Sequence, residues 1–142
     1  MNNEADYYTL KGYQLIDNAQ ITSSMEDYLE MVCRMLKTQE FARINKLAKR
    51  LNVKPSSASK MVNKLRISGL VTFEKYGYIK PTVSGLAAGE YLLYRHDVLN
   101  EFLCLVNHSD SETEQVEKIE HFLNRNTVNN IQRLIHIIGD KI

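Results

Sequence analysis

Apolar residues recur every three or four positions between residues 44 and 67, and this spacing predicts two short helices. The first stripe breaks at residues 52–54. Pro55 then suits the first turn of a second helix, where its missing N–H costs no hydrogen bond, and Gly69 ends that helix. The two stripes consist of Ile44, Leu47, Ala48 and Leu51, and of Ala58, Met61, Val62 and Leu65. Two short helices joined by a tight turn are typical of a helix-turn-helix.

The residues after Gly69 alternate between apolar and polar side chains, which predicts a β-hairpin. Val71 and Phe73 belong to the outgoing strand, residues 76–77 turn the chain, and residues 78–80 form the returning strand. A hairpin directly behind a helix-turn-helix is a wing, which is placed to touch phosphates or the minor groove of DNA.

Helical spacing also predicts the elements on either side of this unit. A helix should begin near Ser23 or Ser24, where Ser23 and Glu26 fit a capping box. Its apolar stripe consists of Met25, Tyr28, Leu29, Val32, Cys33 and Leu36. Behind the wing, Thr82 is expected to cap a helix over residues 83–106, which at 1.5 Å per residue is roughly 35 Å long. A helix of that length can join two domains.

Two further helices are expected in the C-terminal part of the chain. Ser111 with Glu114 can open a helix that runs to about Arg125, and Thr127 can open the last helix. The last helix carries an apolar side made of Val128, Ile131, Leu134, Ile135 and Ile138. That much apolar surface in so short a stretch favours a homodimer interface.

Charge is distributed unevenly along the chain. Residues 43–80 hold ten Lys or Arg and one acid, which gives +9, so with a formal net charge of +1 the remainder carries −8. The basic part is typical of a phosphate-binding surface on double-stranded DNA, and a merely solvated helical face is the alternative. The candidate DNA-binding residues are Arg43, Lys46, Lys54, Ser56, Ser57, Ser59, Lys60, Asn63, Lys64 and Lys75.

Neither a secretory signal nor a membrane-spanning segment is visible in the pattern. The longest apolar runs are far shorter than the roughly 20 residues that cross a bilayer, and the N-terminus lacks a basic and then apolar stretch. Cys33 and Cys104 fall inside apolar helical patterns and are expected to be reduced core residues. We therefore expect a cytoplasmic protein with no membrane contact.

Acidic residues and histidines form a second constellation. Asp27 and Glu30 are spaced i, i+3 on the first predicted helix, which puts both on one side of it. An ExxEH motif, expected on one helical face, contains Glu117, Glu120 and His121, and His96 lies midway along the long helix. Carboxylates with imidazoles suit a divalent cation such as manganese or iron. Taken singly, each piece is more often a solvated face or a structural histidine.

These patterns predict a mainly α protein with two folded parts. Residues 22–82 form a winged helix-turn-helix DNA-binding domain, and residues 83–142 form a helical domain for metal binding and dimerisation. The helix at 83–106 links the two. Residues 1–21 are polar and form an N-terminal arm, which the sequence leaves open as either a flexible segment or a short added strand.

Four stretches taken together resemble the diphtheria toxin repressor family, specifically its manganese transport regulator branch. They are residues 24–30 (SMEDYLE), 54–65 (KPSSASKMVNKL), 94–99 (YRHDVL) and 116–121 (VEKIEH). The resemblance extends from residue 22 to about residue 138. It implies a manganese-responsive transcriptional repressor of metal uptake that binds operator DNA as a homodimer.

The resemblance also implies a ligand set for two metal ions per subunit. The implied ligands are Asp27, Glu30, His96, Glu117, Glu120 and His121, and all six residue types are present. In the iron-responsive branch a methionine stands at the position of Asp27 and a cysteine at that of Glu117. The oxygen ligands found here favour Mn2+ over Fe2+. The 21-residue arm and Pro81 before the helix cap depart from the family pattern without removing a ligand.

Three other functions remain as alternatives. An iron-responsive regulator of the same family would use the same site with Fe2+, and a metal-independent winged-helix regulator would leave the acids as surface. A dinuclear metalloenzyme is the alternative from another class, because manganese held by carboxylates can activate water. The chain shows no separate general base and no phosphate-binding glycine loop, so we do not expect an enzyme.

Overall fold

The described part of the chain is mainly helical, which confirms the predicted fold class. The computed structural model describes residues 9, 21–74 and 77–139. Most of the predicted arm, the tip of the wing and Lys75 lie outside these residues. The elements are the helices α2 (Ser23–Lys37), α3 (Ile44–Leu51), α4 (Pro55–Ile67), α5 (Val83–Asn107), α6 (Thr113–Ile119) and α7 (Arg125–Gly139), the 3-10 turn η3 (Glu120–Phe122), and the strands β1 (Val71–Phe73) and β2 (Ile79–Pro81).

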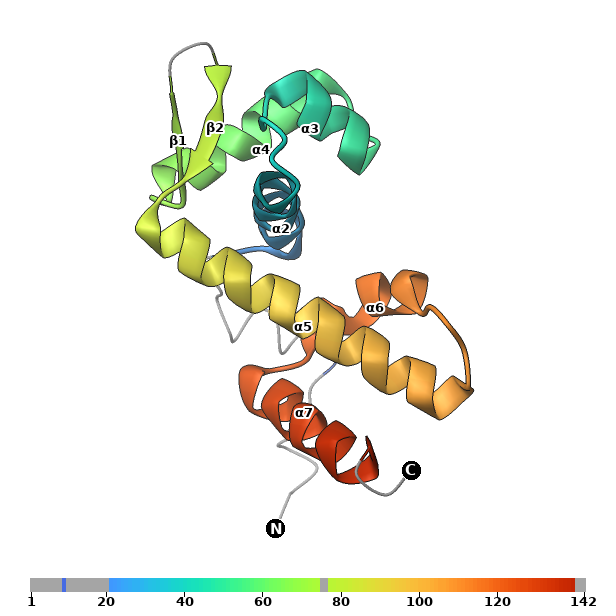
Figure 1. The fold of residues 1–142 in the computed structure, drawn as a ribbon. Coiled ribbons are helices and arrows are strands. Elements are labelled where there is room, and N and C mark those ends of the chain that lie inside the picture. The colour runs from blue at the N-terminus through green and yellow to red at the C-terminus, as the bar shows by residue number, and fades with distance from the viewer. Residues whose placement is uncertain (1–8, 10–20, 75–76, 140–142) are drawn as a thin grey trace.

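The helix-turn-helix and its wing are built around α2. In Figure 1, α2 lies between α5 on one side and α3, α4 and the hairpin on the other. The hairpin is antiparallel, with Val71 opposite Pro81 and Phe73 opposite Ile79. One apolar core joins the inner faces of α2, α3 and α4 to the hairpin and to the first half of α5. The predicted stripes of these helices supply that core, apart from Leu36, because the last turn of α2 reaches the core through Met35.

Helix starts follow local capping chemistry. The start of α2 at Ser23 is as predicted although its capping residue differs, whereas the starts of α6 and α7 differ from the prediction. Thr82 caps α5 as expected, because its hydroxyl accepts a hydrogen bond from the Gly85 N–H at 3.0 Å. In α2, Thr22 takes the role predicted for Ser23 and accepts from the Met25 N–H. In α7, the Asn124 side chain accepts from the Thr127 N–H, so the helix begins before Thr127.

The start and end of α6 also differ from the prediction. The helix begins at Thr113, two residues after Ser111, and it ends at Ile119, well before Arg125. A 3-10 turn over Glu120–Phe122 follows, and the backbone of Leu123 is extended. The ExxEH motif is therefore divided between an α-helix and a tighter turn.

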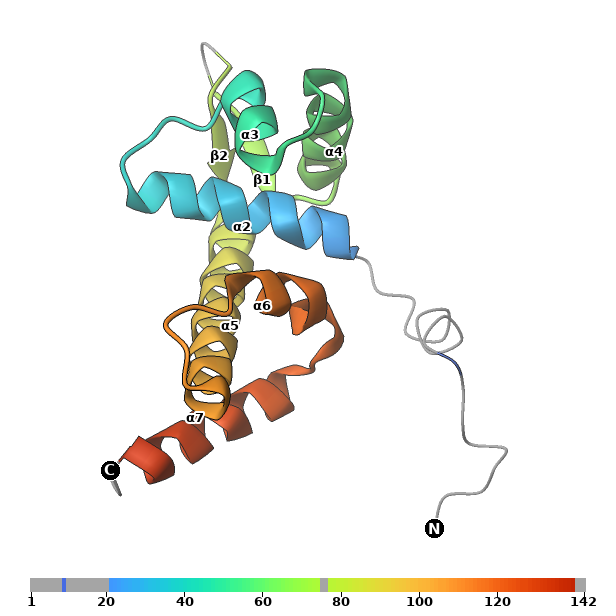
Figure 2. The same ribbon diagram turned by 90° about the vertical axis from the view of Figure 1, so that its right-hand side faces the viewer.

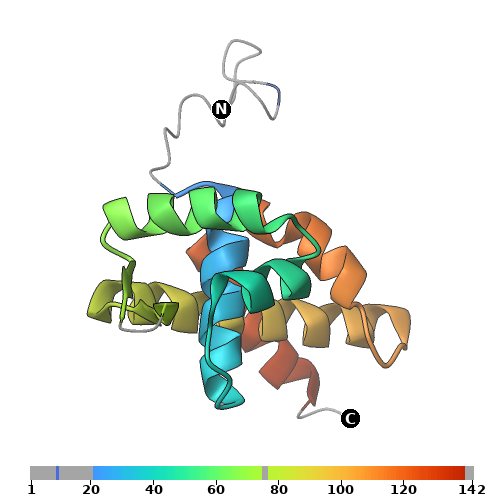
Figure 3. The same ribbon diagram turned by 90° about the horizontal axis from the view of Figure 1, so that it is seen from above.

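The long helix α5 is the spine that joins the two halves. It runs from Val83 to Asn107 and ends at His108, which has a positive φ of 52°. Its second half packs against α6 and α7. Seen from the side, α6 lies between α2 and α7, alongside α5 (Figure 2). Seen from above, α2 runs across α5 and reaches α4 (Figure 3).

The predicted apolar side of α7 is divided between the interior and the surface. Val128 and Ile135 are buried with Val98 of α5 in a second, smaller core. Leu134 is 43% exposed, and the nearby Ile137, which the prediction did not include, is 55% exposed. The prediction that this whole side forms a dimer interface is therefore wrong for the two buried residues, because α5 already covers them.

Two glycines allow α5 to approach its neighbours closely. A Cβ atom on Gly85 would overlap the carbonyl oxygen of Leu70, and one on Gly89 would overlap the Sγ atom of Cys33. Cys33 is buried as predicted, whereas Cys104 is only half-buried, and both are free thiols. Within the described residues, no helix is both long and apolar enough to cross a membrane.

Replacing Gly85 by alanine should destabilise the fold. The new Cβ would meet rigid backbone at Leu70, and relieving that overlap should cost about 1–3 kcal/mol in the free energy of unfolding. Gly139→Ala is the matched control, because a Cβ there meets open space. Urea denaturation of the two variants measures the difference. Equal stabilities would show that α5 can shift away from Leu70 at no cost.

Candidate metal centre

All six predicted ligands converge where α2, α5 and the segment α6–η3 meet. Their side chains form two groups in which the possible ligand atoms lie within 4.8 Å of one another. The first group contains Glu30, His96, Glu117 and Glu120, and the second contains Asp27, Glu120 and His121. Glu120 belongs to both groups, so the two lie side by side.

The first group surrounds one ring nitrogen of His96. Its Nδ1 atom lies 3.3 Å from Glu120 Oε2 and 3.4 Å from Glu117 Oε1. Glu30 is buried: Oε2 lies 3.4 Å from Arg34, while Oε1 accepts no hydrogen bond from the described residues. A buried carboxylate oxygen without a donor is costly. A divalent cation would satisfy it, so the residues present fit a metal ion.

The second group is arranged around His121. Its Nε2 atom lies 2.9 Å from Oδ1 of Asp27, another member of the group. Its Nδ1 atom lies 2.8 Å from an oxygen of Glu26, a residue outside the predicted set. The two ring nitrogens thus face two different carboxylates of α2.

Burial and like charges shift the pKa values of these groups. Burial, together with the charges of Glu120 and Glu117, raises the pKa of Glu30 to about 7. Burial and the charge of Glu120 likewise raise the pKa of Glu117. Burial alone would raise the pKa of Glu120, but His96, Arg95 and His121 together hold it below its usual value.

The pKa values of His96 and His121 are both raised, so both rings retain their protons to higher pH. Hydrogen bonds to Asp27 and Glu26 raise the pKa of His121 to about 10. The hydrogen bond to Glu120 raises the pKa of His96. Without a metal ion, protons therefore reduce the repulsion between these carboxylates.

The expectation that the ExxEH motif lies on one helical face is wrong. Glu117 lies on α6, whereas Glu120 and His121 lie on η3. A 3-10 turn tightens the backbone, and here the consecutive residues Glu120 and His121 both reach the centre. The prediction from helical periodicity required a continuous α-helix, and the sequence pattern does not indicate the switch to a 3-10 turn at Glu120.

Sequence reasoning did not identify Glu26 and Arg95. Nη2 of Arg95 lies 3.3 Å from Glu120 Oε1, 3.4 Å from Glu26 Oε1 and 3.3 Å from His121 Nδ1. The Arg95 side chain is only 4% exposed. The sequence offered one indication of their role: each of the two residues directly precedes a predicted ligand along the chain. A helical arginine is usually solvated, so only the packing reveals this role.

The candidate DNA-binding residues lie on the side of α3 and α4 away from the core. All of them except Lys75, which is outside the described residues, are exposed, whereas Ala58, Val62 and Leu65 of α4 are buried. Arg43 stacks on Tyr78 of the wing, with 4.5 Å between Cζ and the ring centroid. This exposed side of α4 has the character of a major-groove reader.

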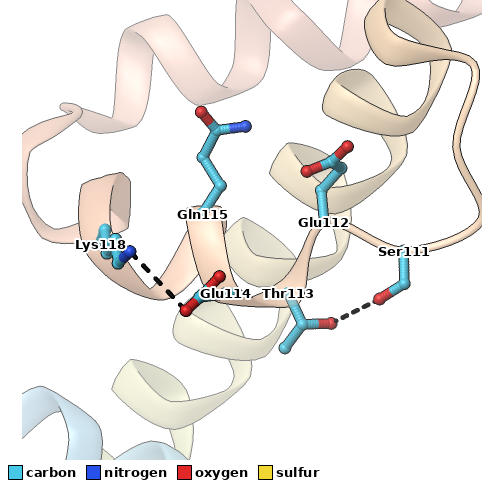
Figure 4. Close-up of a pocket in the computed structure, with 6 residues that line it drawn as sticks. All are labelled: Ser111, Glu112, Thr113, Glu114, Gln115 and Lys118. Carbon is cyan, nitrogen blue, oxygen red and sulfur yellow. Dashed lines mark hydrogen bonds and ion pairs between the residues drawn. The ribbon is translucent and has the colours of Figure 1, made fainter.

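A polar hollow at the start of α6 is separate from the metal centre. It is lined by Ser111, Glu112, Thr113, Glu114, Gln115 and Lys118, and none of the six candidate ligands contributes to it (Figure 4). Lys118 pairs with Glu114 across 3.8 Å, and the hydroxyls of Ser111 and Thr113 share a hydrogen bond. Exposed pairs of this kind contribute little to stability or binding.

A family model and individual related proteins indicate the same family. The family model for the N-terminal DNA-binding domain of iron-dependent repressors matches residues 20–79. The HTH-type transcriptional regulator MntR of Oceanobacillus iheyensis is 38% identical over 120 residues, which cover 84% of this chain and 82% of that protein. MntR of Geobacillus kaustophilus is also 38% identical, over 80% of this chain and 82% of the relative.

Solved structures agree on the fold. The manganese regulator SloR matches 79% of this chain with a TM-score of 0.71 and 23% identity. ScaR with bound Zn2+ matches the same share with a TM-score of 0.67 and 23% identity. This chain spans about half the length of each of those two chains, 53% in both cases.

Cation binding at neutral pH should release protons. His121, with a pKa of about 10, must lose a proton before it can donate a lone pair, and Glu30, with a pKa of about 7, is partly protonated. We expect about one to two protons per subunit, and an affinity that rises with pH. Calorimetry in buffers of different ionisation enthalpy measures the release.

His121→Ala is the comparison for this experiment, because it removes the group with the most strongly raised pKa and should release fewer protons. A binding heat that is the same in every buffer would contradict the assignment of His121 and Glu30 to the centre.

Proposed function

Because the chain belongs to the family of metal-dependent HTH-type transcriptional regulators that includes MntR, we propose that it represses metal-uptake genes when manganese is abundant. Members of this family are DNA-binding regulators rather than enzymes, and they depend on a divalent metal. The observation that carries the proposal is the convergence of six potential ligands from both halves of the chain. We assign Asp27, Glu30, His96, Glu117, Glu120 and His121 as the metal ligands.

The donor set favours manganese. Four carboxylates and two imidazoles offer hard oxygen and borderline nitrogen, and none of the six offers sulfur. Cys33, one turn after Glu30, instead packs toward Gly89. The two groups sharing Glu120 support two ions per subunit, whose charge would balance the four carboxylates. Fe2+ is the alternative, since it accepts the same ligands.

The chain's own residues couple the site to DNA binding. When bound, the metal supplies positive charge and coordination bonds in place of the repulsion between carboxylates. Asp27 and Glu30 belong to α2, which packs directly on α4, whereas Glu120 and His121 belong to η3. Fixing α2 against η3 therefore limits the positions that the recognition helix α4 can take.

A homodimer would turn that restriction into operator recognition. The two recognition helices must enter successive major grooves about 34 Å apart. Leu134 and Ile137 of α7 are the exposed apolar residues that we propose at the dimer interface. The metal-bound state is then selected from a broader ensemble of dimers.

In this scheme the two parts of the chain have different roles. Residues 22–82 read double-stranded operator DNA, and residues 83–142 bind metal and dimerise, with the first part of α5 packed into the core of the DNA-binding unit. Such a regulator acts in the cytoplasm. A metal-independent regulator would not require buried ligands from α2, α5 and η3 to converge, so we favour metal control.

Metal-dependent DNA binding is the experiment that tests this function. The purified protein should retard operator DNA with manganese(II) at concentrations where anaerobic iron(II) is less effective, and should not do so with a chelator. His96→Ala and His121→Ala should lose this activation, because the remaining carboxylates cannot replace an imidazole. Both variants should stay folded. His136→Ala is the matched control, since His136 is exposed on α7.

Strong operator binding in the presence of a chelator would favour the metal-independent alternative. Full activation of either histidine variant by manganese would remove that residue from the site.

Substitutions on α4 should weaken DNA binding without changing metal affinity. Lys60→Ala should reduce the salt dependence of binding by about one phosphate contact. Asn63 is a candidate base reader, and its loss should cost about 1–3 kcal/mol of discrimination between operator sequences. Fluorescence anisotropy at several salt concentrations measures both effects. Lys118→Ala, on α6, is the control, and normal binding by both α4 variants would mean that another face of α4 meets DNA.

A further inference from the structure

Glu26 lies beside the proposed ligands without being one of them. Its Oε1 atom lies 2.8 Å from Nδ1 of His121 and 3.4 Å from Nη2 of Arg95. On the opposite side of the same imidazole ring, Nε2 faces Asp27 across 2.9 Å. His121 is thus held between two neighbouring carboxylates of α2, of which only Asp27 belongs to a ligand group.

This arrangement determines which nitrogen of His121 can bind a cation. A neutral imidazole carries its proton on one ring nitrogen and its free lone pair on the other, and the partner of the N–H selects between them. Asp27 Oδ1 faces Nε2 as Glu26 Oε1 faces Nδ1, but Asp27 belongs to a ligand group and Glu26 does not. Once a cation takes up Asp27 and Nε2, Glu26 is the carboxylate left to accept the Nδ1 proton. Nη2 of Arg95 lies 3.3 Å from the same Nδ1 and shares Glu26 Oε1 as its acceptor. The lone pair on Nε2 then points toward Asp27, which shares the second ligand group with His121.

Arg95 compensates for the additional charge that Glu26 brings. Glu26 would be a fifth carboxylate in a site whose four carboxylates two divalent cations already balance. The buried guanidinium of Arg95 reaches Glu26 Oε1 and Glu120 Oε1 from α5, next to His96 in the sequence. Glu26 and Arg95 together are neutral and connect α2, α5 and η3.

We propose that Glu26 and Arg95 are positioning residues of the metal centre: Glu26 holds the Nδ1 proton of His121, and Arg95 holds Glu26 and Glu120 in place. This proposal rests on the proposed function, because both residues are proposed to orient ligands of the proposed metal site. Neither residue touches the cation, so their effect is on how well the ligands are oriented before it arrives.

The affinity for manganese(II) alone tests the role of Glu26. Glu26→Leu removes the acceptor at Nδ1 and should weaken binding about 10- to 100-fold, the usual effect of losing an outer-shell partner. Glu26→Gln keeps an acceptor oxygen and should lose clearly less. Glu90→Leu is the matched control, because Glu90 is an exposed glutamate of α5 whose ion-pair partner, Lys37, is also exposed. Competition with a fluorescent chelator measures all four proteins.

A double-variant comparison tests the role of Arg95. Arg95→Met alone leaves the charges of Glu26 and Glu120 without their common partner and should weaken manganese binding. Combining it with Glu26→Gln removes the positive and the negative charge together, so the double variant should recover part of the loss. A loss in the double variant equal to the sum of the two single losses would show that the residues act independently, against the proposal.

The tautomer of His121 provides a readout that a purely structural role would not change. In the zinc-loaded protein, which is diamagnetic, nitrogen NMR should show the proton of His121 on Nδ1 and the metal on Nε2. In Glu26→Gln the Nδ1–H signal should shift because the acceptor becomes neutral. A proton on Nε2 in the unaltered, zinc-loaded protein would overturn the proposal even if Glu26→Leu fails to fold.

The two hypotheses fail in different ways. If the unaltered protein binds neither manganese nor zinc, the proposed function fails and this inference fails with it. If the unaltered protein binds manganese and folded Glu26→Leu binds it equally well, only the role of Glu26 is overturned.

Discussion

Glu30 and Glu120 are buried carboxylates that approach each other where α2 meets η3, and their repulsion has to be relieved before the two halves of the chain can stay packed. Protons can relieve it, as the raised pKa of Glu30 indicates, and so can the guanidinium of Arg95. A divalent cation relieves it more completely, because it replaces repulsion with bonds to both sides. The stability of this junction therefore depends on which positive charge is present.

In the proposed mechanism, the rest of the fold carries a change at that junction to the DNA-binding unit. The helix α5 belongs to both apolar cores, so it provides a continuous support on which α2 and η3 are held. Gly85 and Gly89 let it approach Leu70 and Cys33 closely, which leaves little freedom for sliding at its first half. The recognition helix α4 packs on α2 rather than on the C-terminal helices. In the proposed mechanism, a change at the candidate metal centre therefore reaches the candidate DNA-binding surface through α2, which packs on α4.

The environment of His121 in the candidate metal centre contains residues other than the proposed ligands. Asp27 and Glu26 are consecutive residues of α2, yet one faces Nε2 and the other faces Nδ1 of the same ring. Arg95 and His96 are likewise consecutive on α5, and both contact Glu120. In each pair one residue is a proposed ligand, Asp27 or His96. Its neighbour in the chain, Glu26 or Arg95, contacts another proposed ligand, His121 or Glu120.

The sequence alone determined the helices, the helix-turn-helix, the wing and the cap at Thr82, because periodicity, proline, glycine and capping residues act locally. It also determined the candidate ligand types, since their spacing and family resemblance are properties of the chain. Only the tertiary structure decided that α6 yields to a 3-10 turn at Glu120, that α5 covers Val128 and Ile135, and that Arg95 is buried between Glu26 and Glu120. The last two features depend on contacts between residues 25 or more positions apart, as with Arg95 and Glu120, and no local pattern encodes which distant residue a side chain will meet.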